Sequence, residues 1–367
     1  MWRPDATIGP NGRGFEPAGE VVVPDADGSA LVGRAAELVP VLRVRPEHTV
    51  ELLAEAGLFR LRVPRRYGGY DCDTRTLVGV AAELGRAGGA AAWMASGYWG
   101  PTWLATMFGA RARDEVFGTP GVLVCGTPSV ASTAVWVDGG IVVDGRWEFV
   151  AGAVHAEWQV AVSVVVPPAG GEPFPVVALV SVADLTVETR DPGTVAETDG
   201  ATTVAKELFV PAHQVVALSA VADWRSVPVS AVWAASSVGA LLGAAFDARD
   251  WYFEDLTTDG GSSRAMSHVQ TMDALTMITD AERVAYRLAT LVDTGAGAWW
   301  SGDDSVRARA DLVEVCRLTR DAAYLLAAVH GSPQLREVTR ALETGSHRTL
   351  TDFDAGAALT GWYRGPR

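Results

Sequence analysis

Apolar residues along this chain change their spacing twice, and these changes divide it into three parts. Residues 1–30 are rich in Gly, Pro and Asp, which is typical of an irregular leader. The region that follows, up to about residue 115, has helical spacing; between residues 47 and 58 it places Val50, Leu53 and Leu58 on one face. The first part of the chain is therefore predicted to be helical.

Local signals mark where these first helices begin and end. Gly57 stands where a glycine often closes a helix, because it adopts the left-handed backbone without strain. Asp73 precedes a second apolar helical pattern, so its carboxylate is expected to cap the first turn. Gly88 and Gly89 interrupt this pattern, and a further apolar helix is expected through Trp103.

Between residues 118 and 216 the chain becomes rich in Val and Thr, with turn residues at intervals. Asp138-Gly139 separates two apolar runs, which is a strong hairpin signal. Strands are expected at 121–126, 134–137, 141–143, 158–166, 175–182, 185–190 and 202–210. No alternation of strands with helices is visible, so an antiparallel barrel or sandwich is predicted.

After residue 227 the pattern is helical again, in long Ala- and Leu-rich segments. Four helices are expected, at 227–256, 267–291, 305–329 and 334–343. The predicted fold class is α+β and mostly α. Its domains are an N-terminal helical domain (1–117), a central antiparallel β-barrel (118–222) and a C-terminal four-helix bundle (223–367).

Composition and charge narrow the class of protein. The chain has 367 residues, of which 49% are hydrophobic and 20% charged, enough for two or three domains with their own cores. Its net charge of −14 disfavours nucleic-acid binding. The N-terminus lacks the apolar region of a signal peptide, and no membrane span is apparent, so a cytoplasmic protein is expected.

Several kinds of site lack their sequence signatures. The three cysteines are far apart, and no two of the six histidines are spaced as a metal-ligand pair on a helix, so neither a disulfide nor a metal site is expected. The glycine-rich motifs of Rossmann and P-loop nucleotide sites are absent, as are the motifs of zinc proteases and α/β-hydrolases.

One aromatic motif in the β-region points to a planar ligand. Trp147 and Phe149 alternate along a predicted strand that stops at Gly152, where a ligand or another backbone could approach closely. Two aromatic rings on one face would suit a flavin ring. The alternative is that both rings fill the β-core.

Together with other motifs, this aromatic stretch makes the chain resemble the acyl-CoA dehydrogenase superfamily over nearly its whole length. Residues 53–59 with the Pro64 to Gly69 turn are similar to the family's N-terminal helix and P-x-x-x-G-G turn, and residues 207–211 match its strand leaving the β-domain. Residues 147–158 resemble the W-x-F-x-S-G-x-x-H-A-x-W signature of its oxygenase branch. Residues 340–348 look like the R-D-x-x-x-G-x-x-H stretch of two-component flavin monooxygenases, such as dibenzothiophene and hydroxyphenylacetate oxygenases and nitrososynthases.

The resemblance implies a fold and a chemistry. The fold is helices, a β-barrel and a four-helix bundle, usually assembled as a homotetramer, with a homodimer as the alternative. The chemistry is a monooxygenation that uses O2 and reduced FMN or FAD (FMNH2 or FADH2) from a separate reductase. It oxidises a small organic substrate, an aromatic compound or a natural-product intermediate, through a C4a-hydroperoxyflavin.

Candidate site residues follow from this resemblance. His347 is the catalytic candidate, because an imidazole can deprotonate a phenol or donate a hydrogen bond near neutral pH; the alternative is a histidine at a helix end. Trp93, Trp99 and His155 are expected to line the substrate pocket, although both tryptophans are also compatible with a core role. The flavin-binding candidates are Thr127, Ser132, Trp147, Phe149, Ala151, Gly152 and Arg264.

Departures from the family pattern leave two other functions open. Ala151 replaces a serine, Ala341 an aspartate, and Asp199 a glycine, so several flavin contacts are changed. These changes permit a flavin-free homologue with a binding or non-redox role. An acyl-CoA dehydrogenase would need a carboxylate facing the flavin, and Glu343 is interpreted instead as a solvated helix residue.

Overall fold

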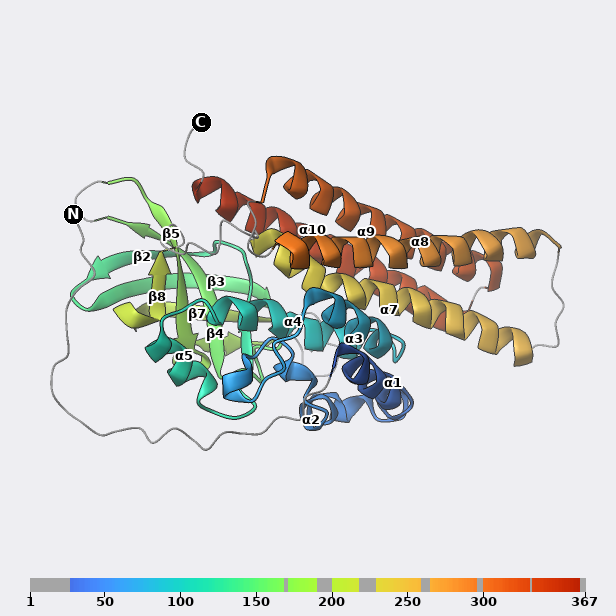
Figure 1. Ribbon diagram of the computed structural model, residues 1–367, viewed down its shortest axis with the longest axis horizontal. Coiled ribbons are helices and arrows are strands. Elements are labelled where there is room, and N and C mark those ends of the chain that lie inside the picture. The colour runs from blue at the N-terminus through green and yellow to red at the C-terminus, as the bar shows by residue number, and fades with distance from the viewer. Residues whose placement is uncertain are drawn as a thin grey trace.

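The computed structural model describes residues 27–167, 171–189, 200–217, 229–258, 265–295, 300–330 and 332–363. Figure 1 shows a β-domain at one end, long C-terminal helices at the other, and the N-terminal helices packed between and beneath them. The order of helices, sheet and helices agrees with the fold predicted from the sequence.

Five helices form the N-terminal part: α1 (Gly28–Val44), α2 (Thr49–Glu55), α3 (Thr74–Gly85), α4 (Ala90–Ala105) and α5 (Ala110–Phe117). The predicted cap is confirmed, because the Asp73 carboxylate accepts a hydrogen bond from the Thr76 backbone N–H at 2.9 Å. Gly57 has the expected left-handed backbone, with φ of 74°. At Gly85 a β-carbon would lie 2.6 Å from Gly243 Cα, so α3 and α7 pack backbone to backbone there.

The β-domain is one eight-stranded sheet in the order β6–β7–β3–β2–β4–β5–β8, with β1 beside β4. Its strands are β1 (Val124–Gly126), β2 (Ser132–Val137), β3 (Gly140–Val150), β4 (Trp158–Val166), β5 (Phe174–Ser181), β6 (Thr186–Glu188), β7 (Ala201–Pro211) and β8 (Val215–Ala217). The hairpin predicted at Asp138-Gly139 is confirmed as the β2–β3 connection.

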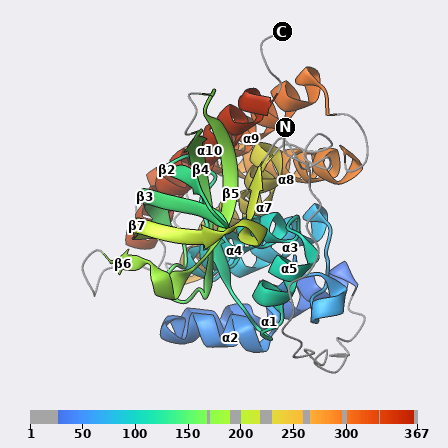
Figure 2. The ribbon, with the colours of Figure 1, turned by 90° about the vertical axis from the view of Figure 1, so that its left-hand side faces the viewer.

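The prediction of a wholly antiparallel barrel needs correction. β1 and β2 both pair with β4 in parallel, so the sheet is mixed, and its described pairings form an open path from β6 to β8. Periodicity along a strand reports which face is buried, but not the direction of its neighbour. Figure 2 shows these strands in front of the bundle helices.

Four long helices complete the chain: α7 (Val229–Thr258), α8 (Ala265–Gly295), α9 (Gly302–His330) and α10 (Pro333–Tyr363). Within α7 the segment Val229–Glu254 is long and apolar enough to cross a membrane, but 94% of its most apolar window is buried inside the protein. Burial among α3, α4 and the other bundle helices accounts for this apolar length. α10 is much longer than the predicted helix at 334–343.

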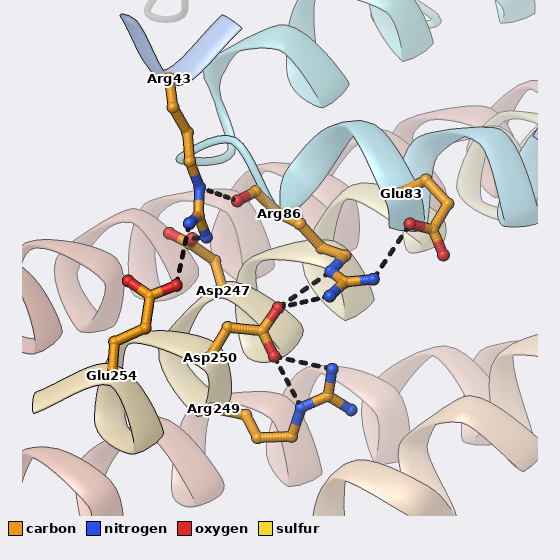
Figure 3. A network of polar contacts seen from close by, with 7 residues as sticks. All are labelled: Arg43, Glu83, Arg86, Asp247, Arg249, Asp250 and Glu254. Carbon is orange, nitrogen blue, oxygen red and sulfur yellow. Dashed lines mark hydrogen bonds and ion pairs between the residues drawn. The ribbon is translucent and has the colours of Figure 1, made fainter. Parts of the chain in front are cut away.

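Ion pairs tie the N-terminal helices to α7 (Figure 3). Arg43 of α1 contacts Asp247 at 3.0 Å and Glu254 at 3.3 Å, both on α7. Arg86, directly after α3, contacts Asp250 of α7 at 2.8 Å. Since Asp247 is only 1% exposed, this network fixes α1 and α3 on the bundle at a buried point.

Candidate functional site

Three elements meet at the end of β3 and form a closed junction. Tyr98 of α4 donates its hydroxyl to the Gly152 carbonyl at 2.9 Å, directly after β3. Gly345 of α10 lies against the Trp93 indole of α4, leaving no room for a β-carbon. Arg348 of α10 donates to the carbonyl at Phe149 with an Nη2–O distance of 2.6 Å. We call this meeting point of α4, α10 and residues 149–152 the junction.

The two aromatic residues of β3 do not share a face, contrary to the sequence interpretation. Trp147 is fully buried, whereas Phe149 is 49% exposed and has a left-handed backbone with φ of 57°. The register with β7 shifts between Trp147 and Val150, which marks a β-bulge. Gly200, directly before β7, packs tightly against the backbone of Phe149, since a β-carbon at Gly200 would lie 2.6 Å from the Phe149 carbonyl carbon. The bulge turns Phe149 outward and leaves Trp147 in the core.

Two predicted flavin-binding hydroxyls have partners within the protein. The Thr127 hydroxyl accepts the Ser129 backbone N–H at 3.3 Å, as a turn-capping threonine does. The Ser132 hydroxyl donates to the Val162 carbonyl at 3.0 Å and also contacts the Ser163 hydroxyl, joining β2 to β4. Both roles as flavin ligands stay predictions, and both side chains are buried.

The turn after β3 contains three further candidates. Ala151 is 8% exposed and carries no hydroxyl. Gly152 has φ of 69°, and a β-carbon there would overlap Tyr98, so both its backbone and the space around it require glycine. His155 is exposed and closes the turn, its backbone N–H donating to the Gly152 carbonyl at 3.0 Å.

The helix α10 places its ionisable side chains on different flanks. His347 is exposed in the middle of the helix, so its position is not the helix end that the sequence alternative assumed. Arg348 and Asp352 are half-buried and lie one turn apart on a common flank, from which Arg348 contacts the junction. At 100° per residue, His347 lies about 140° around the helix from Asp352. The histidine therefore lies on a different flank from Asp352, and its catalytic role stays a prediction.

The spacing of the motif agrees with this geometry. In the R-D-x-x-x-G-x-x-H pattern the histidine follows the glycine by three residues, whereas His347 follows Gly345 by two. Arg348 occupies the third position, and it is Arg348 that contacts the junction. A guanidinium donates hydrogen bonds but does not take up a proton, so this position cannot act as a base.

The remaining candidates are spread over the molecule. Trp93 is partly buried at the junction, as a pocket residue would be. Trp99 is fully buried and donates its indole N–H to the Leu58 carbonyl at 3.0 Å, which is the core alternative. Glu343 is exposed on α10 and accepts a hydrogen bond from Tyr324, as expected for a surface residue. Arg264 and Asp199 lie outside the described residues.

The cysteines have the properties of packed side chains. Burial raises the pKa of Cys72 and of Cys316 to about 11 and raises that of Cys125 still further. Thiols with raised pKa values are poor nucleophiles at neutral pH. Across the described ranges no group of three or more His, Cys, Asp or Glu side chains is placed to hold a metal ion.

The junction offers an aromatic side chain but few side-chain polar groups to a ligand. Phe149 offers a half-exposed aromatic ring, while Trp93 packs against Gly345 and Tyr98 against Gly152. Among the predicted ligands, Thr127 and Ser132 already have partners and Ala151 has no polar side chain. Arrangements of this kind would hold a ring by stacking more than by side-chain hydrogen bonds.

Sequence reasoning missed two of the junction's polar residues. Arg348 stands in the stretch that resembles R-D-x-x-x-G-x-x-H, but the last position of that motif was assigned to His347. Asp352 belongs to no motif. The signal that could have found them was helical spacing: Gly345, Arg348 and Asp352 recur every three or four residues and so share one flank. That signal was lost because the last helix was predicted to end at residue 343.

Comparisons with known proteins place this architecture in a family. Residues 34–113 match the N-terminal domain of acyl-CoA dehydrogenases. The chain is 30% identical over 198 residues to the oxygenase component of an FADH2-dependent resorcinol hydroxylase from Rhizobium sp. (strain MTP-10005), covering 51% of this chain and 48% of that protein. It is 29% identical over 186 residues to HsaA, the oxygenase subunit of a flavin-dependent monooxygenase from Mycobacterium tuberculosis, covering 50% and 46%. The matches span about half the length of these curated relatives.

Solved structures extend the similarity to nearly the whole chain. XiaF from Streptomyces sp., in complex with FADH2 and glycerol, superposes with a TM-score of 0.81 and 26% identity, covering 93% of this chain and 96% of that one. A nitrososynthase from Micromonospora carbonacea has a TM-score of 0.72 at 20% identity, covering 93% and 99%, and shares the fold. The N-terminal domain thus matches that of the acyl-CoA dehydrogenases, and the chain is similar in sequence and in fold to the oxygenase components of two-component flavin monooxygenases.

Proposed function

We propose that this protein is the oxygenase component of a two-component monooxygenase that uses O2 and reduced FAD or FMN. The observation that carries the proposal is the junction at the end of β3, in a fold that superposes over almost its full length on an FADH2-bound relative. A separate reductase would supply the reduced flavin, as the designation "oxygenase component" of its relatives implies.

Reduced flavin, when bound, supplies the two electrons with which one atom of O2 is transferred to a substrate and the other leaves as water. The chain's own residues would bind the flavin and orient its ring. Phe149 is the aromatic side chain placed to contact a ring, and its backbone is held by Arg348. The close packing of Trp93 on Gly345 and of Tyr98 on Gly152 would exclude water from that part of the junction.

Aromatic compounds are the substrate class that the relatives favour. Among the related proteins are a resorcinol hydroxylase, an indole-3-acetate monooxygenase and a p-hydroxyphenylacetate 3-hydroxylase. The structural relatives include a nitrososynthase and a complex of KijD3 with FMN and an amino sugar nucleotide, so a natural-product intermediate is the second substrate class. The same relatives support both FADH2 and FMN as cofactors.

We also propose that the protein assembles as a homotetramer or homodimer and is cytoplasmic. Its proposed domains are residues 1–117, 118–222 and 223–367. Val269 and Met272, one turn apart on α8, are 65% and 60% exposed, and such apolar pairs are often buried between subunits.

Anaerobic titration of the purified protein with FMNH2 and FADH2, followed by rapid mixing with O2, tests the proposal. We expect saturable binding of at least one reduced flavin, and reoxidation whose time course differs from that of the same flavin free in solution. Failure of both reduced flavins to bind would contradict the proposal and favour the flavin-free homologue. Tight binding of oxidised FAD that is bleached by an acyl-CoA would favour the dehydrogenase instead.

A further inference from the structure

A carboxylate lies half-buried on the flank of α10 at the junction. Asp352 follows Arg348 by one helical turn, so the two side chains lie on the same flank. On one side, Arg348 is fixed to the Phe149 carbonyl at 2.6 Å. On the other, a β-carbon at Gly356 would lie 2.8 Å from Ser230 Cα at the start of α7. Asp352 therefore lies between two contacts that fix α10, one turn along the helix from the arginine that holds the Phe149 backbone.

This carboxylate differs from the two buried aspartates of the bundle, Asp247 and Asp311, which are both paired. Asp247 contacts Arg43 at 3.0 Å, and Asp311 contacts Arg287 at 2.6 Å. Within the part of the chain that the structure describes, no hydrogen bond or ion pair joins the Asp352 carboxylate to any residue. Because removing an unpaired carboxylate from water costs stability, such a group is typical of positions where a ligand is recognised.

The protonation of Asp352 is set by burial. Burial raises the pKa of Asp352 to about 6, and the Arg348 guanidinium acts in the opposite direction. A carboxyl with a pKa near that value is ionised at neutral pH and can still take up a proton. Arg348 cannot do so, and His347 points away from this flank.

We propose that Asp352 accepts a hydrogen bond, and then the proton, from a hydroxyl group on an aromatic substrate bound at the junction. In this step the substrate O–H bond breaks, its electron pair stays on the substrate oxygen, and the proton forms a bond to a carboxylate oxygen of Asp352. No oxidant or reductant takes part. The inference rests on the proposed monooxygenase function, since a phenolate is more reactive toward an electrophilic oxygen than the phenol is.

Binding of resorcinol to the full-length protein without flavin tests the inference, with 1,3-dimethoxybenzene as a probe that lacks the hydroxyl groups. Asp352→Asn keeps the volume of the side chain but removes its charge, and we expect it to weaken resorcinol binding by about tenfold or more. Binding of the dimethyl ether is expected to stay the same. Asp354→Asn is the matched control, because Asp354 is an exposed residue of the same helix that pairs with Arg309 at 3.0 Å.

Turnover and reduced-flavin binding separate a catalytic role from a structural one. Supplied with reduced flavin, Asp352→Asn is expected to lower kcat for resorcinol by about 100-fold or more, with an unchanged Kd for the reduced flavin. Asp352→Glu, which restores a carboxylate, is expected to recover part of the rate.

Three results would overturn the inference: equal resorcinol binding by wild type and Asp352→Asn, no resorcinol binding by the wild type, or loss of reduced-flavin binding in Asp352→Asn. Failure of the proposed function is seen separately, as a wild-type protein that binds neither reduced flavin.

Discussion

At Gly152 in the junction, the choice of residue is limited by backbone conformation and by the space that neighbouring side chains leave. Gly152 combines a left-handed backbone with a neighbour, Tyr98, that fills the position of any β-carbon. The same tyrosine donates its hydroxyl to the Gly152 carbonyl. Both constraints fix the turn that follows β3 against α4, and this turn carries Phe149 and Ala151 at its edge.

Replacement of Gly152 tests this constraint. We expect Gly152→Ala to lower the free energy of unfolding by about 2–5 kcal/mol, the sum of a left-handed alanine and an overpacked site. Gly121→Ala is the control: Gly121 has φ of 79°, but a β-carbon there would have no atom within 4 Å, so only the backbone cost of about 1–2 kcal/mol applies. Urea denaturation measures both variants, and equal losses would show that Tyr98 imposes no steric limit.

At the scale of elements, α10 depends on packing rather than on intrinsic helix propensity. Its middle contains Thr344, Gly345 and Ser346, which are poor helix formers. Even so, the helix continues unbroken from Pro333 to Tyr363, because its buried face packs on α7 and α9. Gly345 allows α4 to approach closely enough for Trp93 to lie on the helix backbone.

A pair of glycine-to-alanine variants separates these two effects. Gly33, exposed in α1, has nothing within 4 Å of a β-carbon, so Gly33→Ala is expected to stabilise the protein by about 0.5–1 kcal/mol. Gly345→Ala gains the same helix propensity but displaces Trp93, and we expect a net loss of about 1–2 kcal/mol. Thermal unfolding of the two variants should shift Tm in opposite directions. A rise of Tm in both would mean that Trp93 can move aside without cost.

At the scale of the whole molecule, the N-terminal helices are attached to the bundle through a buried carboxylate. Asp247 belongs to the network in Figure 3, where its partner is Arg43 of α1. Burial raises the pKa of Asp247 to about 7, and the Arg43 guanidinium opposes this shift. The attachment of α1 therefore responds to pH in the range where this group titrates.

The pH dependence of stability tests that response. The folded-state pKa of Asp247 lies above its ordinary value of 3.8, so the folded state binds this proton more tightly than the unfolded chain does. The resulting stabilisation is fully present below about pH 4 and is lost as the pH rises through about 7. Asp247→Asn cannot titrate, so the difference in unfolding free energy between wild type and variant should change from pH 4 to 7 and level off above. A constant difference for Asp247→Asn would contradict the assignment.

Local sequence signals determined much of this architecture. Asp73, Gly57 and the Asp138-Gly139 turn each act over a few residues through backbone geometry and capping hydrogen bonds, and the structure confirms them. β4 was expected at 158–166 and runs over those residues, because a fully buried strand bounded by turn residues has a clear pattern. The order of helices, sheet and helices follows from these signals together with the resemblance of motifs.

Only the tertiary structure decided the make-up of the junction. Pairing with β7 creates the bulge that turns Phe149 outward and buries Trp147, and no alternation within β3 could reveal that shift. Packing on α7 and α9 extends α10 beyond residue 343, and the resulting helix brings Arg348 to the junction. The parallel pairing of β1 and β2 with β4 likewise depends on chain crossings between distant segments. Local chemistry specifies elements and turns, whereas the choice of which side chains meet is made by long-range packing.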